Sequence, residues 1–356
     1  MEGPFSLLEG HEQIVFGNDP PSGLRCIIAI HSTALGPGLG GTRFYPYDDE
    51  EDALVDALRL SRAMSYKAAC AGLDLGGGKA VIIGDPETDK TEALLRAYGR
   101  CVEALSGRYV TACDVGTYPR DMAVVGRETR WATGADPEHG GSGDSGVMTA
   151  LGVYEGIKAC AQRVWGSDDL RGKHIAVQGV GKVGRNLVGH LHAEGAKLTV
   201  ADVNERAVAW AAEHAGAEVV TPDKVHAVDA DVLSPNALGG VLNDATIPEL
   251  SCPIVAGGAN NQLEEPEHGD ALADAGILYA PDYVINAGGL IQVSDELQPG
   301  GFSESRTRHR IATIRERLHE VFEEAAATGT STAWASEQVA ERRIREVGRL
   351  RGFWLP

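Results

Sequence analysis

The chain has 356 residues, 43% of them hydrophobic and 23% charged, an ordinary composition for a soluble globular protein of two domains. Its 51 acidic and 32 basic residues give a formal net charge of −19, which argues against nucleic acid or an anionic membrane as a partner. No apolar run is long enough to span a bilayer, and the first residues lack the basic and apolar regions of a secretory signal. We therefore expect a cytoplasmic protein.

The cysteines show neither metal-site nor disulfide spacing. None belongs to a C-x-x-C pair, so we expect no metal site and interpret them as buried thiols in a reducing compartment. The six are Cys26, Cys70, Cys101, Cys113, Cys160 and Cys252.

Strands and helices alternate in the first part of the chain. Apolar β-branched runs predict strands over 24–30, 80–86 and 108–112, and a 3.6-residue period predicts helices over 51–69 and 92–105. The stretch 132–146 is rich in Gly, Asp, Pro and Ser without a period, so it predicts a loop and a domain boundary. A connecting helix is expected over 147–166.

The second part alternates in the same way. Strands are expected over 174–178, 197–203 and 229–235 and helices over 183–196 and 204–214, with the pattern continuing through 251–261, 277–283 and 285–292. Two charged helices follow residue 303, separated near 328–332.

This order of elements predicts an α/β protein of two domains. Residues 1–146 would form an N-terminal α/β substrate-binding and catalytic domain, and 147–329 a Rossmann-type, doubly wound parallel sheet, with a cleft between the two. The last helix, about 330–356, would pack back on the first domain.

Residues 178–185, QGVGKVGR, carry a dinucleotide-binding pattern. Gly179, Gly181 and Gly184 follow a predicted strand and open a predicted helix, and Asp202 ends the next strand. The loop residues Gly179, Val180, Gly181, Lys182, Val183 and Gly184 would hold a pyrophosphate. Asp202 would accept the adenine-ribose hydroxyls and repel a 2′-phosphate, which favours NAD, although the nearby Arg206 could accommodate that phosphate. A βαβ unit that uses its glycines only for packing is the alternative.

Two lysines flank a glycine-rich stretch that we interpret as a turn, SYKAACAGLDLGGGKAVIIGDP, residues 65–86. Lys67 and Lys79 place two ammonium groups near Gly76, Gly77 and Gly78 in an otherwise acidic chain. This predicts a local site for a small anion that approaches the backbone closely.

Seven segments share the motifs of one enzyme family. They are HSTALGPGLGGTRFYP (31–46), SYKAACAGLDLGGGKAVIIGDP (65–86), YVTACDVGT (109–117), GVMTALGVYEGIKA (146–159), VQGVGKVG (177–184), VAGGANNQL (255–263) and VINAGGLIQVSDE (284–296). On these motifs, which cover most of residues 31–296, the chain resembles the amino acid dehydrogenase superfamily of glutamate, leucine, phenylalanine and valine dehydrogenases.

The resemblance implies roles at the reacting site. Lys67 would hold the carboxylate of an α-amino acid, and the Gly40–Gly41 pair would let the backbone approach the same end. Lys79 matches the catalytic lysine that activates the water attacking the iminium left by hydride transfer. Burial and the Lys67 charge would lower its pKa toward the working pH. Asp114 matches the acid that exchanges protons with the amine and ammonia; judged without the resemblance, it could equally be a turn or N-cap residue.

Further positions follow from the resemblance. The substrate-binding set would also include Met64, Asn261, Leu290 and Val293, and the cofactor-binding set Ser145, Thr149, Asn260 and Arg43. By pattern alone, Thr149 could be an ordinary helix residue and Asn260 an Asx-turn residue. Leu290 and Val293 could be helix core, and Arg43 could reach a phosphate or form an ion pair.

The substrate is expected to be apolar. Leu39 stands where glutamate enzymes of the family carry a lysine for the side-chain carboxylate, and Leu290 and Val293 match positions that line the side-chain pocket. Gly38 replaces an alanine of the leucine enzymes, which would enlarge the pocket and favour L-phenylalanine, converted to phenylpyruvate, ammonia and NADH. Leucine or valine is the alternative, because a methylene or two discriminates by only ~1–3 kcal/mol.

Two other classes compete with this interpretation. A catalytically silent NAD-binding protein would not need Lys67, Lys79 and Asp114 together, and a Rossmann reductase acting without ammonia would not explain the paired lysines. The expected partners are an amino acid, its 2-oxo acid and ammonia, and family members are homo-oligomers. Asn236 departs from the cysteine common in the family.

Overall fold

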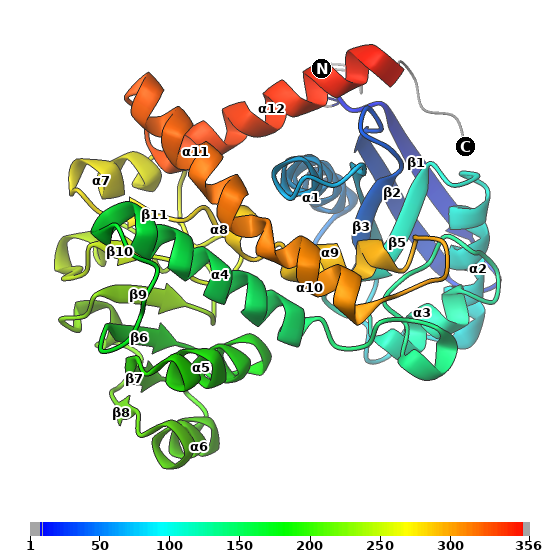
Figure 1. Ribbon diagram of the computed structural model, residues 1–356. Coiled ribbons are helices and arrows are strands. Elements are labelled where there is room, and N and C mark those ends of the chain that lie inside the picture. The colour runs from blue at the N-terminus through cyan, green and yellow to red at the C-terminus, as the bar shows by residue number, and fades with distance from the viewer. Residues whose placement is uncertain (1–7, 9, 352–356) are drawn as a thin grey trace. The chain divides into compact units, whose positions relative to one another are not determined.

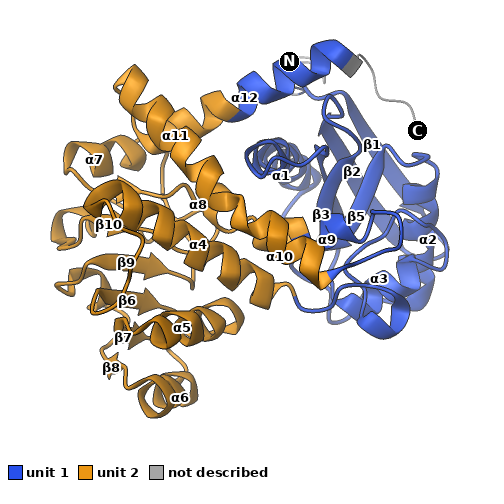
Figure 2. Ribbon diagram, in the orientation of Figure 1, with its two compact units in different colours: residues 1–144, 292–303, 340–356 blue, residues 145–291, 304–339 orange. Residues whose placement is uncertain are grey.

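The computed structural model describes residues 8 and 10–351, which form two compact units (Figures 1 and 2). Unit 1 comprises residues 1–144, 292–303 and 340–356, and unit 2 comprises 145–291 and 304–339. Each unit contains its own sheet with helices packed on it. The predicted two-domain α/β class is confirmed.

Unit 1 is built on a five-stranded mixed sheet with the strand order β1-β2-β4-β3-β5. The strands are β1 (Gln13–Asp19), β2 (Leu24–Ser32), β3 (Gly38–Tyr45), β4 (Gly76–Ile83) and β5 (Tyr109–Cys113). β2 is antiparallel to β1 and β4, whereas β3 is parallel to β4 and β5. Three neighbouring strands therefore end at the same edge of the sheet.

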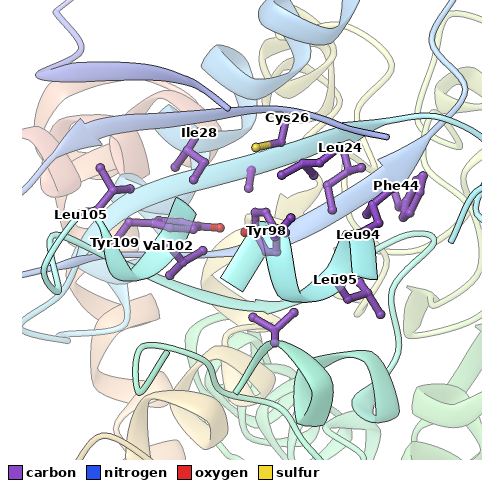
Figure 3. Close-up of a cluster of buried hydrophobic side chains, with 14 of the residues drawn as sticks. Leu24, Cys26, Ile28, Phe44, Leu94, Leu95, Tyr98, Val102, Leu105 and Tyr109 are labelled. Atoms are coloured by element: carbon purple, nitrogen blue, oxygen red, sulfur yellow. The ribbon is translucent and has the colours of Figure 1, made fainter. Parts of the chain in front are cut away.

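Two helices bury the two faces of this sheet. α1 (Glu50–Cys70) begins at the N-cap Asp49, whose side chain accepts from the Asp52 amide, and packs on Ile27, Ala29 and Val81. α2 (Glu92–Glu103) covers the opposite face, where a stripe at four-residue spacing, Leu94, Tyr98 and Val102, packs against Leu24, Ile28 and Phe44 (Figure 3). The short α3 (Pro119–Val125) packs against α2 and β5.

The strands and helices predicted in unit 1 are confirmed as β2, β4, β5, α1 and α2, with shifted ends. Two strands were missed. β1 is an edge strand without a fully buried residue, and β3 contains three glycines, which lower strand propensity and resemble a turn signal.

The expected glycine-rich turn at Gly76–Gly78 is wrong, because these residues open strand β4. A Cβ atom added at Gly77 would lie 2.2 Å from the backbone nitrogen of Ser65 on α1. One added at Gly78 would lie 2.5 Å from the ring of Tyr109 on β5. The glycines let β4 pack closely on both faces, which a pattern of turn residues cannot distinguish from a turn.

Unit 2 contains a six-stranded parallel sheet with the order β11-β10-β9-β6-β7-β8. The strands are β6 (His174–Gln178), β7 (Lys197–Ala201), β8 (Glu218–Val219), β9 (Val232–Pro235), β10 (Ile254–Val255) and β11 (Leu278–Tyr279). After the central strand β6, the strands β7 and β8 are added on one side of it. The strands β9, β10 and β11 are then added on the other side. This is the doubly wound Rossmann topology, with its switch point between β6 and β9.

The helices of unit 2 include α4 (Gly146–Trp165), α5 (Lys182–Glu194), α6 (Glu205–Ala215), α7 (His268–Asp274), α8 (Asp282–Ile285), α10 (Glu304–Ala312) and α11 (Ile314–Thr328). α9 (Gly288–Asp295) and α12 (Thr332–Arg351) contribute residues to both units. α5 forms because Gly184, Leu187, Val188 and Leu191 make one buried stripe, and α4 packs against both α5 and α11.

The predictions for this part of the chain hold best near the switch point. β6, α5, β7, α6, β9 and the helix break at 328–332 are confirmed. The segments 251–261 and 277–283 contribute only two-residue strands, and 285–292 is helical. The helical tail after residue 303 contains a further break at Thr313.

None of the helices within the described residues is long and apolar enough to cross a membrane. Across residues 8 and 10–351, no group of three or more His, Cys, Asp or Glu side chains could hold a metal ion. The six cysteines are free; Cys101 and Cys113 are half-buried and the others are buried.

The contact at Gly77 leads to a stability prediction. Gly77→Ala should lower the free energy of unfolding by about 1–3 kcal/mol, because the new methyl group meets backbone atoms of Ser61 and Ser65 that cannot rotate away. The control is Gly189→Ala in the interior of α5, where an added Cβ has no neighbour within 4 Å and should be neutral or stabilising. Urea unfolding curves measure both, and equal midpoints for the two variants would contradict the packing argument.

Candidate active site

A buried ion pair joins the two residues predicted to be catalytic. Lys79, on β4, is 5% exposed, and its Nζ donates a short hydrogen bond to Oδ2 of Asp114, directly after β5. A second cation from the intervening strand β3, Arg43, places its Nε 3.3 Å from the same oxygen. Three adjacent parallel strands thus bring two cations to one carboxylate.

Local structure holds Asp114 in place. The Asp114 amide donates to Thr117 Oγ1 (2.9 Å), and that hydroxyl donates to the Thr42 carbonyl of β3 (2.7 Å). Gly41 is required beside this turn, because an added Cβ would lie 2.8 Å from Cβ of Asp114. Asp114 is therefore a turn residue, one of the two alternatives considered, and the same turn directs its carboxylate to Lys79.

The guanidinium of Arg43 is tied to α1 as well. Its Nη1 lies 2.8 Å from Oδ2 of Asp56, which also accepts from the Tyr47 hydroxyl at 2.6 Å. Of the two alternatives for Arg43, the structure shows the ion pair; a contact with a cofactor phosphate stays a prediction. The sequence analysis missed Asp56 and Tyr47, since a single acid on a helix carries no signal of its partner on a strand.

Burial and neighbouring charges change the pKa values of both Lys79 and Asp114. Burial lowers the pKa of Lys79, and Arg43 lowers it further; the Asp114 carboxylate opposes this without cancelling it. Burial raises the pKa of Asp114, but the Lys79 and Arg43 charges outweigh burial and hold that pKa below its ordinary value. The predicted lowering of the Lys79 pKa by burial is confirmed, but the cation that contributes to it is Arg43, whereas the sequence analysis had named Lys67.

The other predicted substrate residues of unit 1 lie on α1 and β3. Lys67, in the last turn of α1, is half-buried, as is Met64. Lys67 is two residues beyond Ser65, where the α1 backbone reaches Gly77, and Lys79 is two residues beyond Gly77. Each lysine therefore lies two residues from one close helix–strand contact, and a joint role of Lys67 and Lys79 at one substrate stays a prediction.

Gly40 of β3 lies close to the β4 backbone and accepts a hydrogen bond from Tyr109 of β5. An added Cβ at Gly40 would lie 1.7 Å from the Gly78 carbonyl oxygen, and the buried Tyr109 hydroxyl donates to the Gly40 carbonyl at 2.7 Å. Gly40 is required by this backbone approach, whatever else it binds. The sequence analysis missed the role of Tyr109, because its sequence context is that of any aromatic residue in a buried strand.

The glycine loop of unit 2 has the geometry of a pyrophosphate site. Gly179 adopts φ +90°, and a Cβ at Gly184 would lie 1.9 Å from the Gly179 carbonyl oxygen, so both must be glycine. At Gly181, the N-cap of α5, an added Cβ would find no atom within 4 Å. The loop leaves open space at the helix N-terminus, where amide donors and the helix dipole favour a phosphate, so these residues fit NAD.

Asp202 is hydrogen-bonded to this glycine loop. Its Oδ2 accepts from the Val180 amide at 2.6 Å, and its Oδ1 accepts from the Asn204 amide at 2.8 Å. Each oxygen keeps a further lone pair for a ribose hydroxyl. Arg206 is exposed two residues beyond Asn204, and Lys182 and Val183 form the first turn of α5.

Asn236, the departure from the family pattern, has a structural role. Its side-chain nitrogen donates to the Ser234 carbonyl (2.9 Å), its side-chain oxygen accepts from the Gly258 amide (2.9 Å), and its own amide donates to the Gln178 carbonyl (2.6 Å). Asn236 thus joins the ends of β6, β9 and β10 beside the glycine loop.

The other predicted cofactor residues of unit 2 form two small groups. Ser145, the N-cap of α4, and Thr149 lie against Gly289, whose added Cβ would be 2.8 Å from Thr149 Oγ1. Asn260 accepts from the Asn286 amide group at 2.7 Å, a partner that the sequence analysis missed.

Three predicted substrate residues remain. Asn261 adopts φ +51° and is exposed. On α9, Leu290 is buried and Val293 half-buried, and their contact with the substrate side chain stays a prediction.

The chain is similar to known proteins over nearly its whole length. The family described as Glu/Leu/Phe/Val dehydrogenase, dimerisation domain, matches residues 11–131, and that described as Glutamate/Leucine/Phenylalanine/Valine dehydrogenase matches 140–205 and 198–352. Leucine dehydrogenase of Geobacillus stearothermophilus is 52% identical over 345 residues, 97% of this chain and 94% of that protein. Valine dehydrogenase of Streptomyces albus is 54% identical over 340 residues, 95% of this chain and 93% of that protein.

Solved structures are similar as well. L-tryptophan dehydrogenase from Nostoc punctiforme has a TM-score of 0.87 and 46% identity, covering 96% of this chain and 97% of that chain. The hetero-hexameric glutamate dehydrogenase from Thermus thermophilus has a TM-score of 0.77 and 25% identity, covering 99% and 93%.

The chain therefore belongs to the Glu/Leu/Phe/Val dehydrogenase family, as its motifs predicted. It is an NAD-dependent amino acid dehydrogenase, an oxidoreductase acting on CH–NH2 donors.

The position of Asp202 leads to a prediction on coenzyme preference. Asp202→Asn removes the charge that repels a 2′-phosphate and should shift the ratio of kcat/KM for NADP to that for NAD by about tenfold, or about 1.4 kcal/mol, toward NADP. Because the variant also loosens the loop, steady-state rates with both coenzymes are needed, so that loop effects cancel in the ratio. A parallel loss with both coenzymes would contradict the charge argument.

Proposed function

We propose that this enzyme oxidatively deaminates a branched aliphatic L-amino acid, leucine or valine, to its 2-oxo acid and ammonia. The observation that carries the proposal is the similarity over nearly the whole chain to proteins named leucine and valine dehydrogenase, at 52% and 54% identity. The phenylalanine prediction is not supported by these relatives, which favour its stated alternative.

The environments of Gly38 and Leu39 fit this choice. An alanine methyl at Gly38 would lie 3.2 Å from the Gly77 carbonyl oxygen, within the β3–β4 pairing. The missing methyl group is thus no argument for a larger side-chain pocket. Leu39 is 1% exposed on β3, where a lysine would serve a side-chain carboxylate, so glutamate remains a poor candidate.

In the proposed mechanism, Lys67 binds the α-carboxylate as a point charge with rotatable donors. NAD, when bound, accepts the hydride from the α-carbon. The substrate is left as an iminium, and Lys79 in its neutral form takes a proton from the water that attacks it. The lowered pKa of Lys79 supports this role, because a larger fraction of the amine is neutral at the working pH.

Asp114 then exchanges protons with the amine and the departing ammonia, as its direct contact with Lys79 supports. The carboxylate form, held by the two cations, keeps Lys79 positioned between turnovers. The cost of removing either charge is high, because the partner would stay buried without compensation.

We also propose a homo-oligomer, since the family matching residues 11–131 is described as a dimerisation domain.

The test of the proposed function is an assay of NADH formation with leucine, valine, phenylalanine, tryptophan and glutamate. We expect kcat/KM for leucine or valine to exceed that for phenylalanine by about tenfold or more, which corresponds to the ~1–3 kcal/mol that a few methylenes supply. Preference for phenylalanine or tryptophan would overturn the substrate proposal and leave the mechanism. No NADH with any amino acid would overturn both.

A further inference from the structure

Two cysteines meet in the core of unit 1, on the face of the sheet covered by α2. Cys26, on β2, is 2% exposed and belongs to the apolar cluster of Figure 3. Cys101, near the end of α2, is half-buried and packs against the same cluster. The Lys79–Asp114 ion pair involves neither cysteine.

The sulfur atoms of Cys26 and Cys101 lie beside Gly17 of β1, which has no side chain to occupy the space between them. Gly17 pairs directly with Cys26 across the β1–β2 ladder. A Cβ added at Gly17 would lie 2.6 Å from Sγ of Cys26 and 3.0 Å from Sγ of Cys101. The two sulfurs are therefore at most 5.6 Å apart, the sum of these distances, so the two thiols are direct neighbours in the core.

The pair is chemically asymmetric. A hydrogen bond from the Cys26 thiol, helped by the charge of Arg100, lowers the pKa of Cys101 to about 7, although burial and Asp19 oppose this. The same interaction and burial raise the pKa of Cys26. Cys101 is thus the more acidic and more accessible thiol, and Cys26 is the protonated, buried one.

We propose that Cys101 is a peroxide-reactive thiol and that Cys26 resolves its oxidised form as an intrachain disulfide. The Cys101 thiolate attacks one peroxide oxygen, so that an S–O bond forms and the O–O bond breaks. The sulfur is oxidised to a sulfenic acid and the second oxygen leaves, after protonation, as water or an alcohol. The Cys26 sulfur then attacks Cys101, its proton leaves with the hydroxyl group as water, and the S–S bond replaces the S–O bond.

The disulfide would connect β2 to α2, two elements far apart in sequence, and a reducing dithiol would reverse it. Oxidative deamination consumes none of these groups. The Cys101→Ser variant should therefore keep the rate of NADH formation while losing the disulfide.

The test treats the full-length protein with equimolar hydrogen peroxide near pH 7.5, blocks free thiols with N-ethylmaleimide and maps the unreduced peptides by mass spectrometry. We expect a Cys26–Cys101 peptide pair that dithiothreitol removes and that is absent from Cys101→Ser. In Cys26→Ser, dimedone should trap a sulfenic acid at Cys101. Cys113→Ser is the matched control and should still form the disulfide, since Cys113 is also half-buried but its pKa is raised to about 12 by burial.

A second measurement keeps the proposal falsifiable if a variant folds poorly. In the wild-type protein, the rate of alkylation of Cys101 by iodoacetamide should be half-maximal near pH 7, and that of Cys113 should still be rising at pH 9. Equal peroxide reactivity of Cys101 and Cys113, a disulfide between two chains, or no disulfide at Cys26 would each overturn the proposal.

Discussion

The contact between Lys79 and Asp114 is the interaction on which the rest of unit 1 depends. A buried ammonium group is tolerated only with a compensating charge, and the sheet supplies it from β5 across the intervening strand β3. Arg43 on β3 shares that carboxylate and is itself held by Asp56 of α1. Charge balance, strand order and the position of α1 are thus parts of one arrangement, in which burial and Arg43 lower the pKa of Lys79 and Asp114 limits that fall.

The glycines around this ion pair are required by close packing of the protein's own backbone and side chains. Gly77 allows the backbone of α1 to touch β4, and Gly78 makes room for Tyr109. Gly41 lets the turn of Asp114 approach β3. In unit 2, likewise, Gly184 permits α5 to approach the loop of Gly179, and the open space at Gly181 would admit the predicted pyrophosphate.

The sequence predicted those features that depend on neighbours along the chain. The Rossmann loop, its flanking strand and helix, and Asp202 lie within about one βαβ unit, so their pattern indicates their geometry. Contacts between distant segments were not predictable in this way. Asp56, Tyr109 and Asn286 carry no local signal. The role of Gly76–Gly78 was misread because a close-packed strand and a turn both favour glycine. Substrate preference is the feature that the sequence predicts least well, since it depends on a few methyl groups.

The most direct test of the account is the pKa of Lys79 in the intact enzyme, measured by competitive acetylation with peptide mass spectrometry. In the wild-type protein Lys79 should titrate below the ordinary lysine value of about 10.4, because burial disfavours its charge. In Asp114→Asn its pKa should fall further, because the carboxylate that raises it is gone. An ordinary pKa in the wild-type protein, or a higher one in Asp114→Asn, would contradict the central role of this ion pair.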